Sequence, residues 1–574
     1  MVATPVKTKR LTVQVADLTA DITAIRSLDW DRDRFDIEFG LQNGTTYNSY
    51  LIRGEKIALV DTSHEKFRQL YFDSLNGLIN PQEIDYLIIS HTEPDHSGLV
   101  KDLLQLAPNI TVVGSKVAIQ FLENLVHHPF QRQLVKNGDQ LDLGNGHILE
   151  FVNAPNLHWP DTIFTYDHGS GILFTCDAFG MHYCSDDLYD EQLSAIEPDY
   201  RFYYECLMAP NARSVLAAMK RMEPLGNINL VANGHGPVLK HNVTELLTHY
   251  RDWSQAQTKA EKTVAVFYIS DYGYSDRLCQ SIAKGITKTG LAVETLDLKS
   301  ADPQEVKELA SSAVGIVIGT PPVSGIHAQE ITGNLGTILA SVNPKQYLGM
   351  FESKGDDDES ILPLFNKFRE VGLTKAFDPI RSAETPNESL YQRCEEAGTD
   401  MGQLLTQEVK VKQRKSLDTD LDKAIGRISG GLYIITTKKG DRSGAMVASW
   451  VTQASFDPPG FTVAVAKDRA IESLMQVGDQ FILNILEEGN YQTLMKHFLK
   501  RFGPGEDRFA GVNTRTANNG SPILADALAY LECEVVSRME CADHWIVYNK
   551  VTDGRVSKPD SLTAVHHRKV GNYY

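Results

Sequence analysis

The chain has 574 residues, which is too long for one hydrophobic core and favours three or four domains. Its apolar fraction of 42% and charged fraction of 23% are ordinary for globular proteins and argue against disorder. The net charge of −18 argues against nucleic acid and anionic membrane surfaces as partners, because an acidic chain repels phosphate.

The seven cysteines are scattered, and no two of them form a CxxC pair. This pattern favours reduced thiols in a cytoplasm over a disulfide framework. It also argues against a fused rubredoxin or an all-cysteine zinc site. No apolar run approaches the length of a membrane span, and the N-terminus lacks an apolar signal core. We therefore expect a cytoplasmic protein.

Residues 1–255 contain short apolar runs broken by turn residues, which predict a sheet-rich domain with helices between the strands. The strand-like runs are YNSYLI, KIALVDTS, IDYLIISH, ITVVGS, ILEFVNAP, DTIFTYD, GILFTCD and INLVANGH. A polar helix is expected after them, in TELLTHYRDWSQAQTKAEK.

Potential metal ligands follow several of these runs. Four of these potential ligands lie between residues 91 and 96, and a solvated loop would explain those four if they stood alone. The full set is His91, Glu93, Asp95, His96, His158, Asp177 and His235. Because strand ends on one rim of a sheet converge, we expect these side chains to meet. Seven ligands are too many for one tetrahedral zinc and suit two metals with a bridging carboxylate. Mixed imidazole and carboxylate donors with open positions suit non-haem iron.

The loop HTEPDH, together with His158, Asp177 and the turn GHGP, resembles the metallo-β-lactamase fold, in which hydrolases usually carry HxHxDH. Glu93 stands where the second histidine would be, and this HxExDH form resembles the flavodiiron proteins, which reduce dioxygen or nitric oxide. The resemblance implies two iron ions with Asp177 as the bridge, one bound by His91, Glu93 and His158 and the other by Asp95, His96 and His235. The nearby aromatics Trp159 and Tyr183 could line an oxygen pocket, but a large aromatic is more often a core residue.

Residues 263–405 alternate between strand-like and helix-like runs, which predicts a doubly wound parallel sheet. The strand-like runs are TVAVFYIS, AVETLDL, VGIVIGTP and YLGMFES. The helix-like runs are SDRLCQSIAKGITKTG, DPQEVKELASSA and QEITGNLGTILASV. A charged linker, TQEVKVKQRKSLDTD, is expected to follow.

The segment SDYGYS joins the first strand and helix of this region, where unpaired N–H groups can hold a phosphate. A helix cap with a turn glycine explains it about as well. It resembles the flavodoxin phosphate loop [ST]xTGxT and implies FMN, with the loops GTPPVSGIHA and ESKGDDDES beside the ring. The DDD run departs from this pattern, because it puts negative charge near an anionic cofactor. The expected FMN contacts are Ser270, Asp271, Tyr272, Gly273, Tyr274, Ser275, Thr320, Pro321, Pro322, Val323, Ser353 and Gly355.

Residues 420–574 carry many strand-like runs, which predict a β-barrel. The runs are GLYIITTKKG, FTVAVAKD, QFILNIL, AYLECEVVSRM and HWIVYNKVTDGRV. The segment GAMVASWVTQASFDPP resembles the split-barrel flavin reductases, although ASFDPP also suits a plain turn. This resemblance implies a second flavin, FMN or FAD, with NAD(P)H as electron donor. Its expected contacts are Ala448, Ser449, Trp450, Val451, Ser455, Lys467 and His544.

The order of these regions resembles the oxygen-reducing flavodiiron proteins of photosynthetic organisms, also called diflavin flavoproteins. It implies an NAD(P)H:oxygen oxidoreductase that passes electrons through two flavins to a diiron centre. Reducing O2 to two waters takes four electrons, which a diferrous pair and one reduced FMN supply together. It also implies a head-to-tail homodimer or a hetero-oligomer with a related flavodiiron protein. Reduced ferredoxin is an alternative donor. Nitric oxide reduction, a zinc hydrolase and a regulatory partner without metals stay open.

Overall fold

The structure, a computed structural model, describes residues 10–32, 34–35, 39–270, 274–299, 301–319, 328–353, 361–382, 386–416 and 419–568. The chain forms two compact units, Met1–Glu261 and Lys262–Tyr574. Among the helices in the described ranges, none combines the length and the apolar character that crossing a membrane requires.

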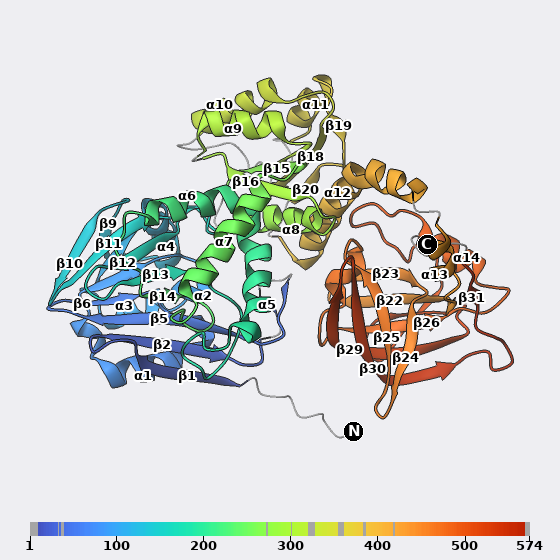
Figure 1. The fold of residues 1–574 in the computed structure, drawn as a ribbon, viewed down its shortest axis with the longest axis horizontal. Coiled ribbons are helices and arrows are strands. Elements are labelled where there is room, and N and C mark those ends of the chain that lie inside the picture. Colours follow the sequence, from blue (N-terminus) through green and yellow to red (C-terminus); the bar gives the residue numbers. More distant parts are fainter. Residues whose placement is uncertain are drawn as a thin grey trace. The chain divides into compact units, whose positions relative to one another are not determined.

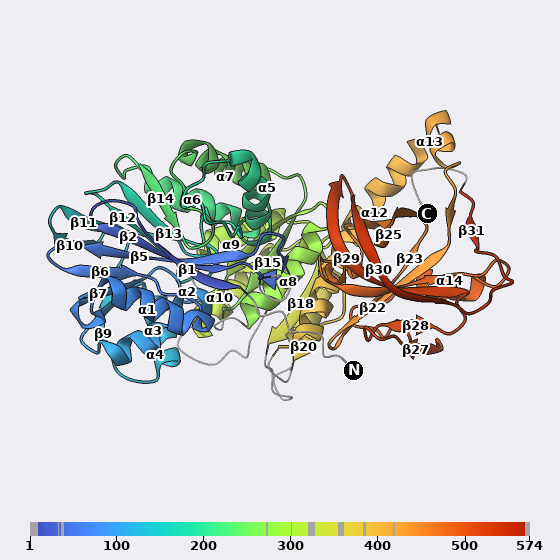
Figure 2. The same cartoon turned by 90° about the horizontal axis from the view of Figure 1, so that it is seen from below.

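Two β-sheets packed face to face form the centre of the first unit (Figure 2). The described strands of the first sheet, in spatial order, are β1 (Leu11–Asp17), β2 (Ile22–Asp29), β5 (Thr45–Arg53), β6 (Ile57–Val60), β7 (Tyr86–Ile89), β8 (Thr111–Gly114) and β9 (Gln131–Leu134). Those of the second are β10 (Gln140–Gly144), β11 (His147–Asn153), β12 (Ile163–Asp167), β13 (Ile172–Cys176) and β14 (Leu230–Asn233). A short pair is made by β3 (Arg34–Phe35) and β4 (Phe39–Gly40). The strand-like runs predicted for this region correspond to strands.

Helices cover the two outer faces of this double layer (Figure 2). The first sheet is covered by α1 (Arg68–Leu78), α3 (Val100–Leu106) and α4 (Lys116–Val126), and the second by α5 (Leu193–Tyr203), α6 (Ala212–Met222) and α7 (Val243–Thr258). The short helix α2 (Pro94–Ser97) and the turns Glu65–Phe67, Pro81–Glu83, Tyr204–Met208 and Ala209–Asn211 lie between them. The central strands are buried on both faces, which explains their continuous apolar runs. This αββα layering confirms the metallo-β-lactamase-like fold.

A parallel sheet begins the second unit, and its strand order is that of flavodoxin-like folds. In spatial order its described strands are β16 (Ala292–Asp297), β15 (Thr263–Tyr268), β17 (Gly315–Gly319), β18 (Tyr347–Ser353) and β19 (Thr374–Lys375), with β20 (Ile380–Ser382) also on β18. One face carries α9 (Pro303–Ser312), α10 (Ala328–Ser341) and α11 (Leu362–Glu370), and the other carries α8 (Ser275–Thr287) and α12 (Glu388–Ser416) (Figure 1). The predicted doubly wound sheet is confirmed.

Helix α12 continues through most of the charged segment that we predicted to be a linker, so this segment is helical as far as Ser416. Lys, Glu, Gln and Arg are strong helix formers, so a solvated helix and a linker can share one composition. The next helix, α13 (Asp420–Ile425), begins at a capping box made by Thr419 and Asp422.

An antiparallel sheet around an apolar core completes the second unit and confirms the predicted β-barrel. Its described strands, in spatial order, are β23 (Arg442–Ala448), β22 (Tyr433–Lys439), β26 (Gln480–Ile485), β29 (Ala529–Cys541), β30 (His544–Val556), β25 (Pro459–Ala466) and β24 (Val451–Phe456). Smaller elements are the pairs β21 (Gly430–Gly431) with β31 (Val565–His566) and β27 (Thr514–Thr516) with β28 (Pro522–Leu524), the turn η5 (Ala470–Leu474) and helix α14 (Gln492–Leu499).

Helices α8 and α12 pack at backbone distance, and glycines make this possible. A Cβ atom on Gly285 would lie 2.0 Å from the carbonyl oxygen of Glu395. A Cβ atom on Gly398 would lie 2.1 Å from the carbonyl oxygen of Ile282. No side chain larger than hydrogen fits at either position without moving one helix.

We predict that Gly285→Ala destabilises the second unit by about 1–3 kcal/mol, because the methyl group forces α8 away from α12. Gly333→Ala in α10 is the matched control, since a methyl group there meets no heavy atom within 4 Å. Removing a flexible glycine from a helix should stabilise by about 0.5–1 kcal/mol. The measurement is the thermal unfolding of both variants, and equal melting temperatures would contradict the packing argument.

Candidate metal centre

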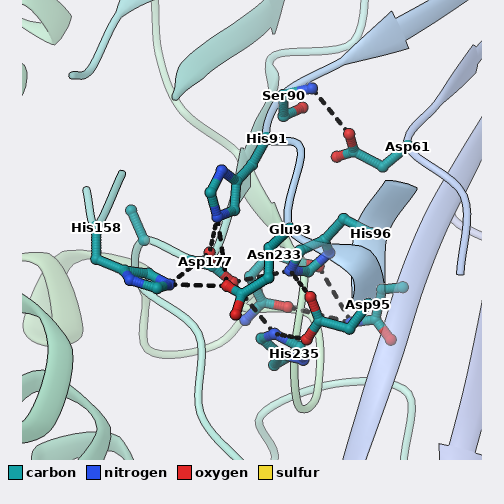
Figure 3. Close-up of polar contacts among 12 residues, drawn as sticks. Asp61, Ser90, His91, Glu93, Asp95, His96, His158, Asp177, Asn233 and His235 are labelled. Atoms are coloured by element: carbon teal, nitrogen blue, oxygen red, sulfur yellow. Dashed lines mark hydrogen bonds and ion pairs between the residues drawn. The ribbon is translucent and has the colours of Figure 1, made fainter. Parts of the chain in front are cut away.

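The seven predicted metal ligands come together where the ends of the two sheets of the first unit meet (Figure 3). His91 follows β7 of the first sheet, and α2 begins directly after Glu93. His158, Asp177 and His235 follow β11, β13 and β14 of the second sheet. We expected convergence on one rim of one sheet, and the structure corrects this: both sheets contribute.

The carboxylate of Asp177 lies between two pairs of histidines. Its Oδ2 is 3.5 Å from Nε2 of both His91 and His158. Its Oδ1 is 2.9 Å from Nε2 of His96 and 3.1 Å from Nε2 of His235. Each oxygen therefore faces one pair of imidazoles, as a bridging carboxylate requires (Figure 3).

One further carboxylate accompanies each histidine pair. Glu93 Oε2 lies 3.0 Å from Nε2 of His158 and 3.4 Å from Nε2 of His91. Asp95 reaches the other pair, with its oxygens 3.5 Å from Nε2 of His96 and 3.4 Å from Nε2 of His235. The potential ligand atoms group as His91, Glu93, His158 and Asp177 on one side and Asp95, His96 and His235 on the other. These groups match the two iron sites implied by the resemblance, and the assignment of ligands stays a prediction.

Burial makes the electrostatics of this cluster strong. Burial alone would lower the pKa of His96, but Asp95 and Asp177 raise it to about 9. Burial likewise opposes charge on His158, yet Asp177 and Glu93 raise its pKa to about 10. The carboxylates thus stabilise positive charge in the space between them. Imidazole and carboxylate donors around such a space fit divalent transition metals such as iron.

A third grouping joins Cys176 to His96 and Asp177. Burial raises the pKa of the Cys176 thiol well above its usual value, with Asp61 and Asp177 adding to the effect.

Hydrogen bonds behind the cluster hold two of its imidazoles in one orientation. Nδ1 of His91 lies 2.9 Å from Oδ1 of Asp161, whose Oδ2 accepts from the backbone N–H and hydroxyl of Thr92 at 2.8 and 2.6 Å. Nδ1 of His235 lies 2.6 Å from the carbonyl oxygen of Thr46. When Nδ1 donates to these oxygens, Nε2 is left free to bind a metal.

Aromatic and hydroxyl groups close the space around the cluster. Trp159 is buried as expected and packs edge-on against His91, with ring centroids 5.0 Å apart. The hydroxyl of Tyr203 donates to Oδ1 of Asp177 at 3.1 Å. His182 is buried beside His235, and its Nδ1 lies 2.7 Å from the hydroxyl of Thr45. Tyr183 is half-buried and packs against the core around α5 to α7.

Sequence reasoning missed Asp161, Thr46, Tyr203 and His182. Asp161 stands three positions after His158, so a search for carboxylates near each predicted ligand would have found it. Nothing in the sequence marks Tyr203, which reaches Asp177 from the far end of α5.

The predicted FMN loop is described only in part. The hydroxyl of Ser270 donates to Oδ2 of Asp297 at 2.7 Å, so it is already engaged by a carboxylate. Tyr274 precedes α8, and Ser275 is its first residue. The remaining contacts, Asp271, Tyr272, Gly273, Thr320, Pro321, Pro322, Val323, Gly355 and the side chain of Ser353, lie outside the described residues. FMN binding by these residues stays a prediction.

Some of the predicted flavin contacts of the barrel meet at one end of β25 and β30. The rings of Trp450 and His544 have centroids 5.1 Å apart. The backbone N–H of Lys467 donates to the carbonyl oxygen of Asp543 at 2.9 Å, which brings Lys467 beside His544. Trp450 is 37% exposed and follows the buried residue Ser449, so this end of the barrel presents an aromatic surface.

The other predicted contacts lie along β23 and β24. Ala448 is the last residue of β23, and Val451 is the first of β24, where it pairs with Val463. Ser455 lies farther along β24, and its hydroxyl donates to the carbonyl oxygen of Pro458 at 2.7 Å. The hydroxyl of Ser455 is therefore engaged within the turn, and flavin binding by these residues stays a prediction.

Comparison with known proteins places both ends of the chain among described families. The model of the flavin reductase like domain matches residues 425–573, and that of the ODP family beta lactamase matches residues 45–236. Diflavin flavoprotein A 1 of Synechocystis sp. is 70% identical over 566 residues, which cover 99% of this chain and 98% of that protein. The metal-soaked Flv1 flavodiiron core from Synechocystis sp. is similar in structure, with a TM-score of 0.63 and 38% identity. This likeness covers 69% of this chain and 99% of that core.

We predict that Asp161→Ala weakens iron binding by about 10- to 100-fold, because the His91 ring loses the carboxylate that orients it. The matched control is Asp167→Ala, which removes the buried partner of His147 Nδ1, 2.8 Å away and outside the cluster. The measurement is iron content after dialysis against graded chelator. Equal iron loss in the two variants would show that Asp161 serves only the stability of the fold.

Proposed function

The chain belongs to the flavodiiron family in its diflavin flavoprotein A form, and from this membership we propose that it is an NAD(P)H:oxygen oxidoreductase. The family makes it an oxidoreductase with flavins and a diiron site. The proposal that this site reduces O2 to water is carried by Asp177, each of whose oxygens faces a separate group of histidines and a carboxylate.

Each iron ion would be held by two imidazoles and one carboxylate of its own. The proposed ligands are His91, Glu93 and His158 for one ion, Asp95, His96 and His235 for the other, and Asp177 between them. When bound, the two flavins relay electrons from NAD(P)H, and the iron pair delivers them to O2. Three protein ligands and a shared carboxylate would leave each ion able to bind a small diatomic substrate.

The surrounding residues of this chain would hold the site in one geometry. Asp161 and the Thr46 carbonyl keep the Nε2 atoms of His91 and His235 directed inward. The Tyr203 hydroxyl donates a hydrogen bond to Asp177 and would so fix the rotation of this carboxylate. Trp159 covers His91 and excludes bulk water from that side.

Three functional regions would share the reaction. We propose the diiron site in residues 1–255, FMN in residues 263–405 and the second flavin, FMN or FAD, in residues 420–574. The flavin reductase match at the C-terminus supports NAD(P)H as donor, with reduced ferredoxin as the alternative. The working form is proposed to be a head-to-tail homodimer or a hetero-oligomer with a related flavodiiron protein.

A zinc hydrolase is the weaker alternative for the same fold. Glu93 stands where such hydrolases usually carry histidine, and a reductase domain has no role in hydrolysis. A metal-free regulatory partner is opposed by the complete set of ligands. Nitric oxide reduction would use the same irons and differs only in the substrate.

We predict that Asp177→Asn abolishes most O2 uptake while NAD(P)H still bleaches the flavins. The amide keeps the shape of the carboxylate but loses the charge that offsets two cations. The measurements are anaerobic bleaching of the flavin spectrum, O2 uptake in an electrode, and iron content. Asp167→Asn, a buried carboxylate outside the cluster, is the control and should retain uptake.

If Asp177→Asn takes up O2 at the parent rate and retains both irons, Asp177 is not a ligand of the site. Zinc as the dominant metal in protein from iron-replete cells would overturn the redox function itself. Faster consumption of nitric oxide than of O2 by the parent would favour the other substrate.

A further inference from the structure

Helix α12 makes contacts on two faces, and one of these faces packs within the flavodoxin-like domain. Gly398 and the Glu395 carbonyl lie against the backbone of α8. Gly402 lies against the side chain of Thr289, just beyond the end of α8. This face belongs to the same layered fold as the parallel sheet.

The other face of α12 contacts the barrel along about four helical turns. The contacting residues recur every three or four positions, so they form one row on the helix. The contacts are Glu388 with Arg442 at 2.9 Å, Gln392 with the Ser443 carbonyl at 2.9 Å, Glu396 with Arg508 at 2.8 Å, Asp400 with Arg501 at 3.2 Å, and Gln403 with the Asp468 carbonyl at 3.0 Å. The helix is acidic on this face, and its partners on the barrel are mostly arginines.

A buried cluster of charges lies beside this row. Within the flavodoxin-like domain, Lys284 pairs with Glu395 at 3.0 Å. Within the barrel, Arg538 pairs with Glu472 of the turn η5. Lys288 joins the two pairs, because its ammonium group contacts Glu395 and also lies 2.8 Å from Glu472. Lys288 is therefore the bridging member of the cluster.

Because the bridge is buried, its charged groups must be held at fixed positions. The side chains of Lys288, Glu395 and Glu472 are only 10%, 6% and 9% exposed. Burial opposes charge on Lys288, but Glu395 and Glu472 outweigh it and raise its pKa well above the usual value. An ammonium group kept charged in a buried place needs its carboxylates held at fixed positions. A loose or sliding contact between the domains would not satisfy it.

We propose that Lys288 and the acidic row of α12 lock the flavodoxin-like domain and the barrel into one rigid electron-transfer module. With both flavins bound, this rigidity would hold the two domains at one spacing while two electrons pass within one chain from a reduced flavin on the barrel, which is oxidised, to FMN on the flavodoxin-like domain, which is reduced. The electron-transfer part rests on the proposed function, whereas the rigidity of the interface does not.

The test uses the full-length protein with Lys288→Met as the main variant. This change removes the cross-domain bridge but leaves Lys284 with Glu395 and Arg538 with Glu472, so each domain keeps its own pair. A second variant adds Glu396→Gln to weaken the contact with Arg508. The control is Lys375→Met, which removes an exposed lysine whose ammonium group lies 2.7 Å from the carboxylate of Asp378.

The first measurement is hydrogen–deuterium exchange in α12 and η5. We expect Lys288→Met to speed exchange there by about tenfold, and the double variant to speed it more, because buried ion pairs couple strongly. Exchange in the parallel sheet and in the barrel core should match the parent, which shows that both domains remain folded. Lys375→Met should leave α12 and η5 unchanged.

The second measurement follows the two flavins separately by anaerobic stopped flow with NAD(P)H. Reduction of the barrel flavin should keep its rate in Lys288→Met, while passage of electrons to FMN should slow and become heterogeneous. Unchanged exchange in both variants would overturn the lock. If the parent protein accepts no electrons from NAD(P)H, the proposed function fails, and exchange alone still decides whether the interface is rigid.

Discussion

The need to neutralise buried carboxylates governs the first unit of this protein. Asp177, Glu93 and Asp95 lie inside a folded core, where an uncompensated negative charge is costly. Four imidazoles from both sheets surround them, and this arrangement creates a space with a strong preference for cations. The two sheets must therefore end at the same place. The rest of the domain, including its helical layers, serves to hold those strand ends in position.

In the second unit, buried carboxylates are neutralised by lysine and arginine side chains. Glu395 and Glu472 are as buried as the carboxylates of the metal cluster, but lysine and arginine surround them. Imidazoles can lose their protons and accept a metal, whereas lysine and arginine stay charged near neutral pH. The choice of cation thus separates a reactive site from a structural one. In the first unit the buried charges form the candidate metal centre. In the second unit they hold the proposed interface between the flavodoxin-like domain and the barrel.

The sequence predicts local features of this fold better than contacts between distant residues. Strands were recognisable because they are buried on both faces and read as continuous apolar runs. The loop from His91 to His96 was recognisable because four ligands are contiguous. Tyr203 was missed, since its contact with Asp177 joins segments that nothing in the sequence connects, whereas Asp161 stands three positions after His158 and could have been found. The acidic row of α12 was not recognised, because an ion pair with a distant arginine leaves no local pattern.

Helix α12 carries two rows of contacting residues, one against α8 and one against the barrel. Successive residues on an α-helix turn by about 100°, so both rows of contacts depend on one continuous count. Losing a single residue in the middle would rotate every later position away from α8 and from the barrel together. Even a change of about seven residues, close to two full turns, would shift every later position by about 10 Å along the helix axis. We infer that insertions and deletions are excluded from the stretch between Glu388 and Gln403.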